Sequence, residues 1–208
     1  MARIPNKELF RAGIAAYEKN EGRGTDYFSA LNKVQTDWGN WSKMTAGIWQ
    51  LLNSWHRQFY RYGGPDLKAI ANCIEQCIAD LNAVRGRVID TLTVADEAQI
   101  DALFNAFLNS THRTNKRGSN QSAVATAKAL HLLAPGFLPL WDDAIASRFG
   151  YVMMTSEDYV LFCWDMKDHA AVVQSFFDTS DDRTVLKRID EFNYAAYTQH
   201  WVPKPRPS

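Results

Sequence analysis

The stretch NWSKMTAGIWQLLNSWHRQFYRY, residues 40–62, decides the fold class. Along it, large apolar side chains recur mostly at spacings of three, four and seven residues: Trp41, Ile48, Trp49, Leu52, Trp55, Phe59 and Tyr60. Such spacing gathers side chains on one side of an α-helix, so the stretch predicts a long amphipathic helix. Gly63-Gly64-Pro65 predicts the end of that helix, with Pro65 in the first turn of the next one.

The same helical spacing continues on both sides of this stretch. Residues 67–81 carry a second apolar stripe, and further helices are predicted at about 96–109, 120–134, 142–149, 156–177 and 182–199. Val88–Val94 (VIDTLTV) has the β-branched composition of a strand, but one short strand cannot make a sheet. We therefore predict an all-α fold.

The composition excludes several classes of protein. Apolar residues make up 46% of the 208 residues, which is too rich for a disordered chain, and 23 basic groups balance 23 acidic ones. Cys73, Cys77 and Cys163 form no C-x-x-C pair, which argues against a disulfide scaffold or a zinc ribbon. We expect neither a metal nor a cofactor, because the sequence contains no paired metal-ligand spacing, phosphate loop or dinucleotide fingerprint.

Two features of the sequence argue against a secreted or membrane protein. The charged N-terminal segment lacks the apolar core of a signal peptide. The longest apolar run, Ala129–Trp141, is interrupted by two prolines and is too short to span a bilayer. A cytoplasmic protein with no membrane partner is therefore expected.

The balance of charge conceals an uneven distribution. Residues 102–141 contain no carboxylate and four basic groups, Arg113, Lys116, Arg117 and Lys128, whereas residues 142–208 are net acidic. The basic segment also holds small polar groups just before a predicted helix start: Gly118, Ser119, Asn120 and Ser122. Such groups bind phosphate, so a DNA-binding loop is expected here. The alternative is a solvated loop in which Ser119 or Asn120 caps the next helix.

The segment that follows ends in Pro139-Leu140-Trp141-Asp142, with Ile145 three positions on. Together with the preceding helix, residues 115–150 resemble the helix-hairpin-helix DNA glycosylase superfamily, and the turn looks like the Pro-x-x-Asp form of its adenine glycosylase branch. The resemblance implies two helical lobes with a cleft between them. We expect one lobe from about residues 1–62 with 151–200, the other from about 65–150, and a mobile tail at 203–208.

The resemblance also implies which residues carry the chemistry. Asp142 would be the catalytic carboxylate that stabilises positive charge on the sugar; the alternative is an aspartate that merely caps a helix. Lys128, on the preceding helix, would be a displaced nucleophile, a phosphate clamp or a surface lysine. The lysine of lyase-competent members would fall near Ala123 or Val124, where this chain has none, so a monofunctional enzyme is expected.

An enzyme that acts on a base in duplex DNA must flip that base out and hold it between flat apolar groups. Trp41, Trp49, Trp55 and His131 are candidates for such a base pocket, although tryptophans at helical spacing are mostly core residues. A lone histidine is also more often simply packed and hydrogen-bonded.

The leading hypothesis is a DNA glycosylase that removes a damaged or modified base, in DNA repair or in defence against phage with modified DNA. Two alternatives stay open: a non-catalytic helical DNA-binding module, and a helical protein-interaction domain.

Overall fold

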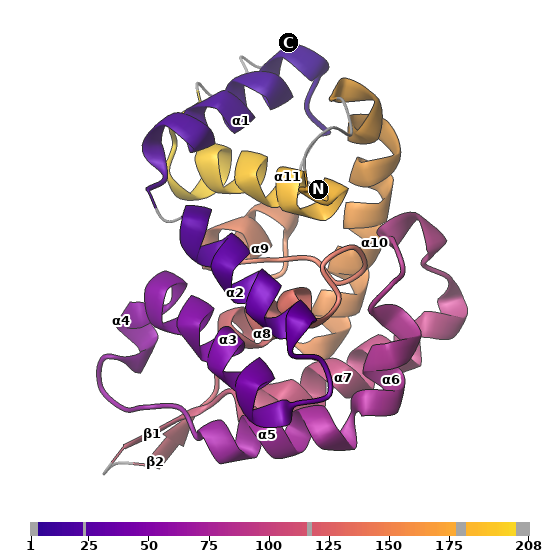
Figure 1. Ribbon diagram of the computed structural model, residues 1–208. Coiled ribbons are helices and arrows are strands. Elements are labelled where there is room, and N and C mark those ends of the chain that lie inside the picture. The colour runs from indigo at the N-terminus through magenta and orange to yellow at the C-terminus, as the bar shows by residue number, and fades with distance from the viewer. Residues whose placement is uncertain (1–3, 23, 116–117, 178–181, 203–208) are drawn as a thin grey trace.

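Helices make up 71% of the described residues and strands 3%, which confirms the all-α prediction. The computed structural model describes residues 4–22, 24–115, 118–177 and 182–202 (Figure 1). The predicted tail at 203–208 lies outside these residues. The α-helices are α1 (Lys7–Asn20), α2 (Gly24–Thr36), α3 (Trp41–Trp55), α4 (Arg57–Tyr60), α5 (Leu67–Gln76), α6 (Ile78–Val84), α7 (Glu97–Ser110), α8 (Ala123–Leu133), α9 (Asp143–Phe149), α10 (Ser156–Val173) and α11 (Val185–Asn193). The shorter elements are the 3-10 turns η1 (Ile89–Thr91), η2 (Val94–Asp96) and η3 (Gln174–Phe176), the π-helical turn η4 (Tyr194–Thr198), and the strands β1 (Arg113–Asn115) and β2 (Gly118–Asn120).

The helices pack in two groups that α10 connects. At one end of the molecule α1 contacts α11 and η4; at the other, α2 and α3 contact each other and α8, and α3 also contacts α5 (Figure 1). Helix α10 runs along one side and contacts both α11 and α7. The expected lobe of residues 1–62 with 151–200 is therefore divided, because α1 lies with α11 while α2 and α3 lie with the segment 65–150.

A single cluster of buried apolar side chains runs through both groups of helices. It extends from Phe10 of α1 through Leu51 of α3 and Phe104 of α7 to Phe192 of α11. Trp141, the largest fully buried side chain, lies within this cluster directly before α9. The turn that carries Asp142 is therefore fixed to the core.

The long helix predicted for residues 40–62 is shorter than expected. It ends at Trp55, His56 leaves the helical backbone (φ −134°), and α4 adds one short turn. The placement of Pro65 in a first helical turn is also wrong. Asp66 caps α5 by accepting a 2.9 Å hydrogen bond from the Ala69 amide, and Pro65 pairs with Arg113 of β1 instead.

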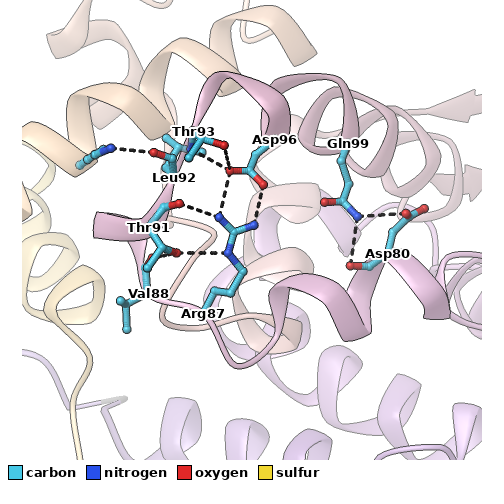
Figure 2. Close-up of polar contacts among 9 residues, drawn as sticks. Asp80, Arg87, Val88, Thr91, Leu92, Thr93, Asp96 and Gln99 are labelled. Carbon is cyan, nitrogen blue, oxygen red and sulfur yellow. Dashed lines mark hydrogen bonds and ion pairs between the residues drawn. The ribbon is translucent and has the colours of Figure 1, made fainter.

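The segment with a strand-like composition, residues 88–94, forms no strand. It folds into η1 and η2 around the Arg87 guanidinium, which donates to Thr91 O at 2.7 Å and to both oxygens of Asp96 at 2.5 and 2.9 Å (Figure 2). Lys167 of α10 donates to Leu92 O at 2.6 Å. Local bonds to arginine and lysine override β-propensity where no partner strand is present.

The acid-free loop forms a hairpin rather than an irregular loop. β1 and β2 pair antiparallel with Thr114 opposite Ser119, and Gly118 adopts φ +121°, a conformation that favours glycine. The next helix is capped by Ser122, whose Oγ accepts from the Ala125 amide at 3.2 Å, and not by Ser119 or Asn120.

Two further global features are clear in the described residues. No helix among them is both long and apolar enough to cross a membrane. The three cysteines are all unpaired.

Candidate active site

A cavity of about 230 Å³ opens where α9 begins. Its volume lies below the roughly 300–1,000 Å³ of pockets for drug-sized ligands, so it suits one small group. Residues from α1, α3, α8, α9, α11, η4 and the adjoining turns line it: Tyr17, Glu21, Trp55, His56, Val124, Lys128, Leu140, Trp141, Asp142, Asp143, Asp190, Tyr194 and Thr198.

Asp142 both caps a helix and lines this cavity. Its Oδ1 accepts a 2.8 Å hydrogen bond from the Ile145 amide in the first turn of α9. Its Oδ2 accepts a 2.7 Å hydrogen bond from the Thr198 hydroxyl. The two interpretations of Asp142 from the sequence are therefore compatible, because one carboxylate occupies both positions.

The electrostatic environment of Asp142 is mixed. Burial raises the pKa of its carboxyl group above the usual value, while the bonds from Ile145 and Thr198 and the charge of Lys128 act in the opposite direction. A carboxylate that is largely removed from water yet fixed at both oxygens interacts strongly with a positive charge that develops beside it.

Lys128 lines the cavity and is not a surface lysine, which was one of the three interpretations from the sequence. Its side chain is 8% exposed in the middle of α8, and Nζ donates a 2.9 Å hydrogen bond to the Trp55 carbonyl at the end of α3. The ammonium group therefore joins α8 to α3 at the wall of the cavity.

His56 connects the cavity to the hairpin. Its Nε2 shares a 2.8 Å hydrogen bond with Oγ of Ser122, the residue that caps α8 just after β2. Burial, with a further contribution from Lys128, lowers the pKa of His56 to about 3, so the imidazole is neutral at neutral pH. Ser122 thus fixes the end of the hairpin against a wall of the cavity.

The aromatic walls of the cavity are held by a buried charge. Lys187 Nζ lies 4.9 Å from the ring centroids of Tyr17, Tyr27 and Trp55, and it donates to Asp190 at 2.8 Å. Tyr17, Trp55 and Asp190 also line the cavity. One buried ammonium group therefore joins the aromatic side chains of the cavity wall to Asp190.

Three of the four residues expected in a base pocket lie elsewhere. Trp41 and Trp49 pack against the core, and the Trp49 ring meets the Tyr60 ring edge-on at 5.2 Å. His131 is fully buried, with Nδ1 donating to Leu138 O at 2.7 Å and Nε2 accepting from the Tyr27 hydroxyl at 2.8 Å. Burial also lowers the pKa of His131 to about 4. Of the four, Trp55 lines the cavity.

Of the expected DNA-binding residues, Ser122 caps α8 and bonds to His56, and the other six divide into three sets. Arg113 is half-buried and donates to Phe59 O at 2.6 Å, with its guanidinium 4.8 Å from the Phe59 ring centroid, so it fastens the hairpin to α4. Gly118, Ser119 and Asn120 are exposed on β2. Lys116 and Arg117 lie outside the described residues.

Several cavity residues have no signal in the sequence. Glu21 and Asp190 come from the region of α1 and from α11, and Thr198 from η4. They reach the cavity because α1, α11 and η4 pack together. Trp141 and Asp143 are different, since their position beside Asp142 in the sequence already marks them.

The described residues contain no group of three or more His, Cys, Asp or Glu side chains arranged to hold a metal ion. No family model, curated protein or solved structure matches this chain.

Proposed function

We propose that this chain is a DNA glycosylase that hydrolyses the N-glycosidic bond of a damaged or modified base flipped into the cavity beside Asp142. One observation carries the proposal: a desolvated carboxylate, fixed at a helix N-terminus, lies in a small cavity with aromatic walls. The resemblance of residues 115–150 to the helix-hairpin-helix glycosylases implies the same role for Asp142.

The chemistry requires a carboxylate of this kind. As the bond from C1′ to the base nitrogen breaks, its electron pair leaves with the base and positive charge builds on the deoxyribose. The Asp142 carboxylate stabilises that charge and orients the water that attacks C1′. The water oxygen becomes the C1′ hydroxyl, and one of the water protons ends on the base nitrogen, so the step is a balanced hydrolysis.

The polarity of the cavity favours a base over a phosphate. Glu21, Asp143 and Asp190 line it together with Asp142, against Lys128 as its basic residue. Phosphate groups are repelled by such a wall, whereas a flat base stacks on Trp55 and Tyr17. Lys128 acts by holding Trp55 and by opposing the rise that burial causes in the pKa of Asp142, which favours the ionised carboxylate.

The test is base release from duplex oligonucleotides that each carry one deaminated, oxidised or alkylated base. Alkali-sensitive strand cleavage reports the abasic product. We expect the wild-type protein to release at least one of these bases, and Asp142→Asn to lower the rate by about 10²–10⁴-fold. Asparagine is as good a helix cap as aspartate, so the variant keeps the fold while it loses the charge.

Asp66→Asn is the matched control. Asp66 caps α5 in the same way, since its Oδ1 accepts a hydrogen bond from the Ala69 amide, and it does not line the cavity. Its variant should retain wild-type activity. Equal base release by Asp142→Asn and the wild type would refute the proposed role of the carboxylate. DNA binding without release of any base would leave a non-catalytic DNA-binding module.

A further inference from the structure

Two acid-free stretches, far apart in the sequence, lie side by side in the structure. Residues 38–65 contain Lys43, Arg57 and Arg61 and no carboxylate, and residues 102–141 likewise contain no carboxylate. The segment from His56 to Pro65 lies against the β1–β2 hairpin and the turns that flank it (Figure 1).

Four hydrogen bonds among the described residues join the segment 56–65 to the hairpin and its flanking turns. They link side chains and backbone from both ends of the hairpin to α4 and the turn after it: His56 Nε2 with Ser122 Oγ at 2.8 Å, Tyr60 Oη to Thr111 O at 2.6 Å, Arg113 Nη1 to Phe59 O at 2.6 Å, and the Thr114 amide to Gly64 O at 3.2 Å. The hairpin and α4 therefore form one surface, here called the α4–hairpin surface.

The exposed part of this surface is basic. Arg57 and Arg61 are four residues apart, both exposed, and with Gln58 they line a shallow depression. In the described part of the chain neither guanidinium forms an ion pair with a carboxylate. Tyr62 exposes 66% of its surface, with the Arg61 guanidinium 5.6 Å from its ring centroid. Unpaired arginines beside an exposed aromatic ring are suited to a phosphate backbone and its bases.

We propose that the α4–hairpin surface binds the phosphate backbone of the DNA strand whose base enters the cavity at Asp142, with Arg57 and Arg61 as phosphate contacts. The inference rests on the proposed function and adds α4 to the hairpin as the binding surface. Trp55 and His56 line the cavity and directly precede Arg57, so this surface begins at the cavity wall.

The α4–hairpin surface and the cavity differ in charge, and each suits a different part of a nucleotide. The cavity is lined by four carboxylates, and the α4–hairpin surface is built from stretches without any. A nucleotide that lies across the boundary places its phosphates on the arginines and its base in the cavity. An acidic peptide could contact the arginines, but it carries no flat base to stack on the aromatic walls of the cavity. DNA is therefore the partner that fits both the α4–hairpin surface and the cavity.

The experiment measures binding alone, with fluorescence anisotropy of a labelled undamaged duplex over a range of salt concentrations. Each lost phosphate contact lowers the slope of log K against log salt by about 0.9. The Arg57→Ala/Arg61→Ala variant should therefore lose roughly two from the magnitude of that slope. The matched control is Lys7→Ala/Arg11→Ala, which removes two exposed cations, also four residues apart, from the first half of α1, away from the cavity residues Tyr17 and Glu21, and should leave the slope unchanged.

The outcomes separate this inference from the proposed function. An unchanged slope in the arginine variant overturns the α4–hairpin surface even if the wild type releases bases. A reduced slope supports the surface even if no base is ever released. Displacement of the duplex by polyglutamate as efficiently as by unlabelled DNA would show a general polyanion site and overturn the assignment to DNA. Far-ultraviolet circular dichroism of both variants confirms that they are folded.

Discussion

Asp142 and His56 line the same cavity, and burial shifts the pKa of each in the direction that favours its neutral form. The pKa of Asp142 is raised and that of His56 is lowered to about 3. Lys128 acts on both groups, lowering each pKa. The lysine thus favours an ionised carboxylate beside a neutral imidazole, the pair of states that suits stabilisation of a cationic sugar.

The lowered pKa of His56 predicts a pH dependence of stability. The unfolded chain binds a proton on this residue near pH 6.5, whereas the folded protein does so near pH 3. Between these values the unfolded state holds more protons, so the free energy of unfolding falls as the pH falls, by about 1.4 kcal/mol per pH unit for one histidine. Guanidinium denaturation at pH 7.0, 6.0 and 5.0 measures it, and in His56→Gln this contribution should be missing.

The exposed His200 provides the control for that experiment. His200→Gln makes the same substitution at an exposed position and controls for the replacement of a histidine by glutamine. An identical dependence in His56→Gln and the wild type would mean that His56 is protonated in the folded state.

At the residue scale, sequence reasoning placed Asp142, Lys128 and Trp55 among the candidate site residues, and all three line one cavity. The first two come from the resemblance of residues 115–150 to the helix-hairpin-helix glycosylases, which covers the turn and the helix before it. Tyr17 and Thr198 could not be found in this way, because their approach depends on how the ends of the chain pack.

At the scale of elements, the starts and ends of helices with strong side-chain caps agree best with the sequence. Helix α9 begins after Asp142 and ends at Phe149, and Gly150 with its left-handed backbone caps it, as the pattern for residues 142–149 predicts. The breaks at His56 and Cys77 have no proline or glycine to announce them. At His56, the hydrogen bond with Ser122 accompanies the break, so tertiary contacts act where the local sequence does not.

The packing of α1 against α11 depends on the absence of a side chain at Gly13. A Cβ atom there would lie 2.5 Å from Cδ2 of Phe192, whose ring is 2% exposed and stacks on Phe10 at 5.3 Å. Gly13→Ala should therefore lower the free energy of unfolding by about 1–3 kcal/mol, although alanine favours a helix. Chemical denaturation measures the change.

Gly24 in α2 is the comparison for this prediction. A Cβ atom there would meet nothing within 4 Å, so Gly24→Ala should be neutral or stabilise the protein by up to about 1 kcal/mol. Equal free energies of unfolding for Gly13→Ala and the wild type would contradict the prediction, because they would mean that the Phe192 ring makes room for the methyl group without loss of stability.

At the scale of the whole molecule, one apolar cluster joins the two groups of helices. We therefore expect a single cooperative unfolding transition, with helix content by circular dichroism and tryptophan fluorescence changing together. Four of the seven tryptophans, Trp38, Trp41, Trp49 and Trp55, belong to the segment of α2 and α3. A fluorescence transition displaced from the circular dichroism transition would indicate two groups that unfold separately.

The all-α class followed from periodicity alone, but the arrangement of helices did not. Periodicity shows which side of a helix is apolar and does not show which helix covers it. The same holds for the distribution of charge. The sequence shows that residues 102–141 lack carboxylates, but only the contacts of the hairpin show that residues 56–65 pack against them.

The hydrogen bond from Thr198 to Asp142 links the middle of the chain to its last described helical turn. A ribosome delivers Asp142 long before Thr198, so a nascent chain holds the carboxylate for some time with one of its two partners missing. The completed cavity therefore exists only once translation has passed residue 198. Prematurely terminated products would carry Asp142 and the hairpin without a finished site.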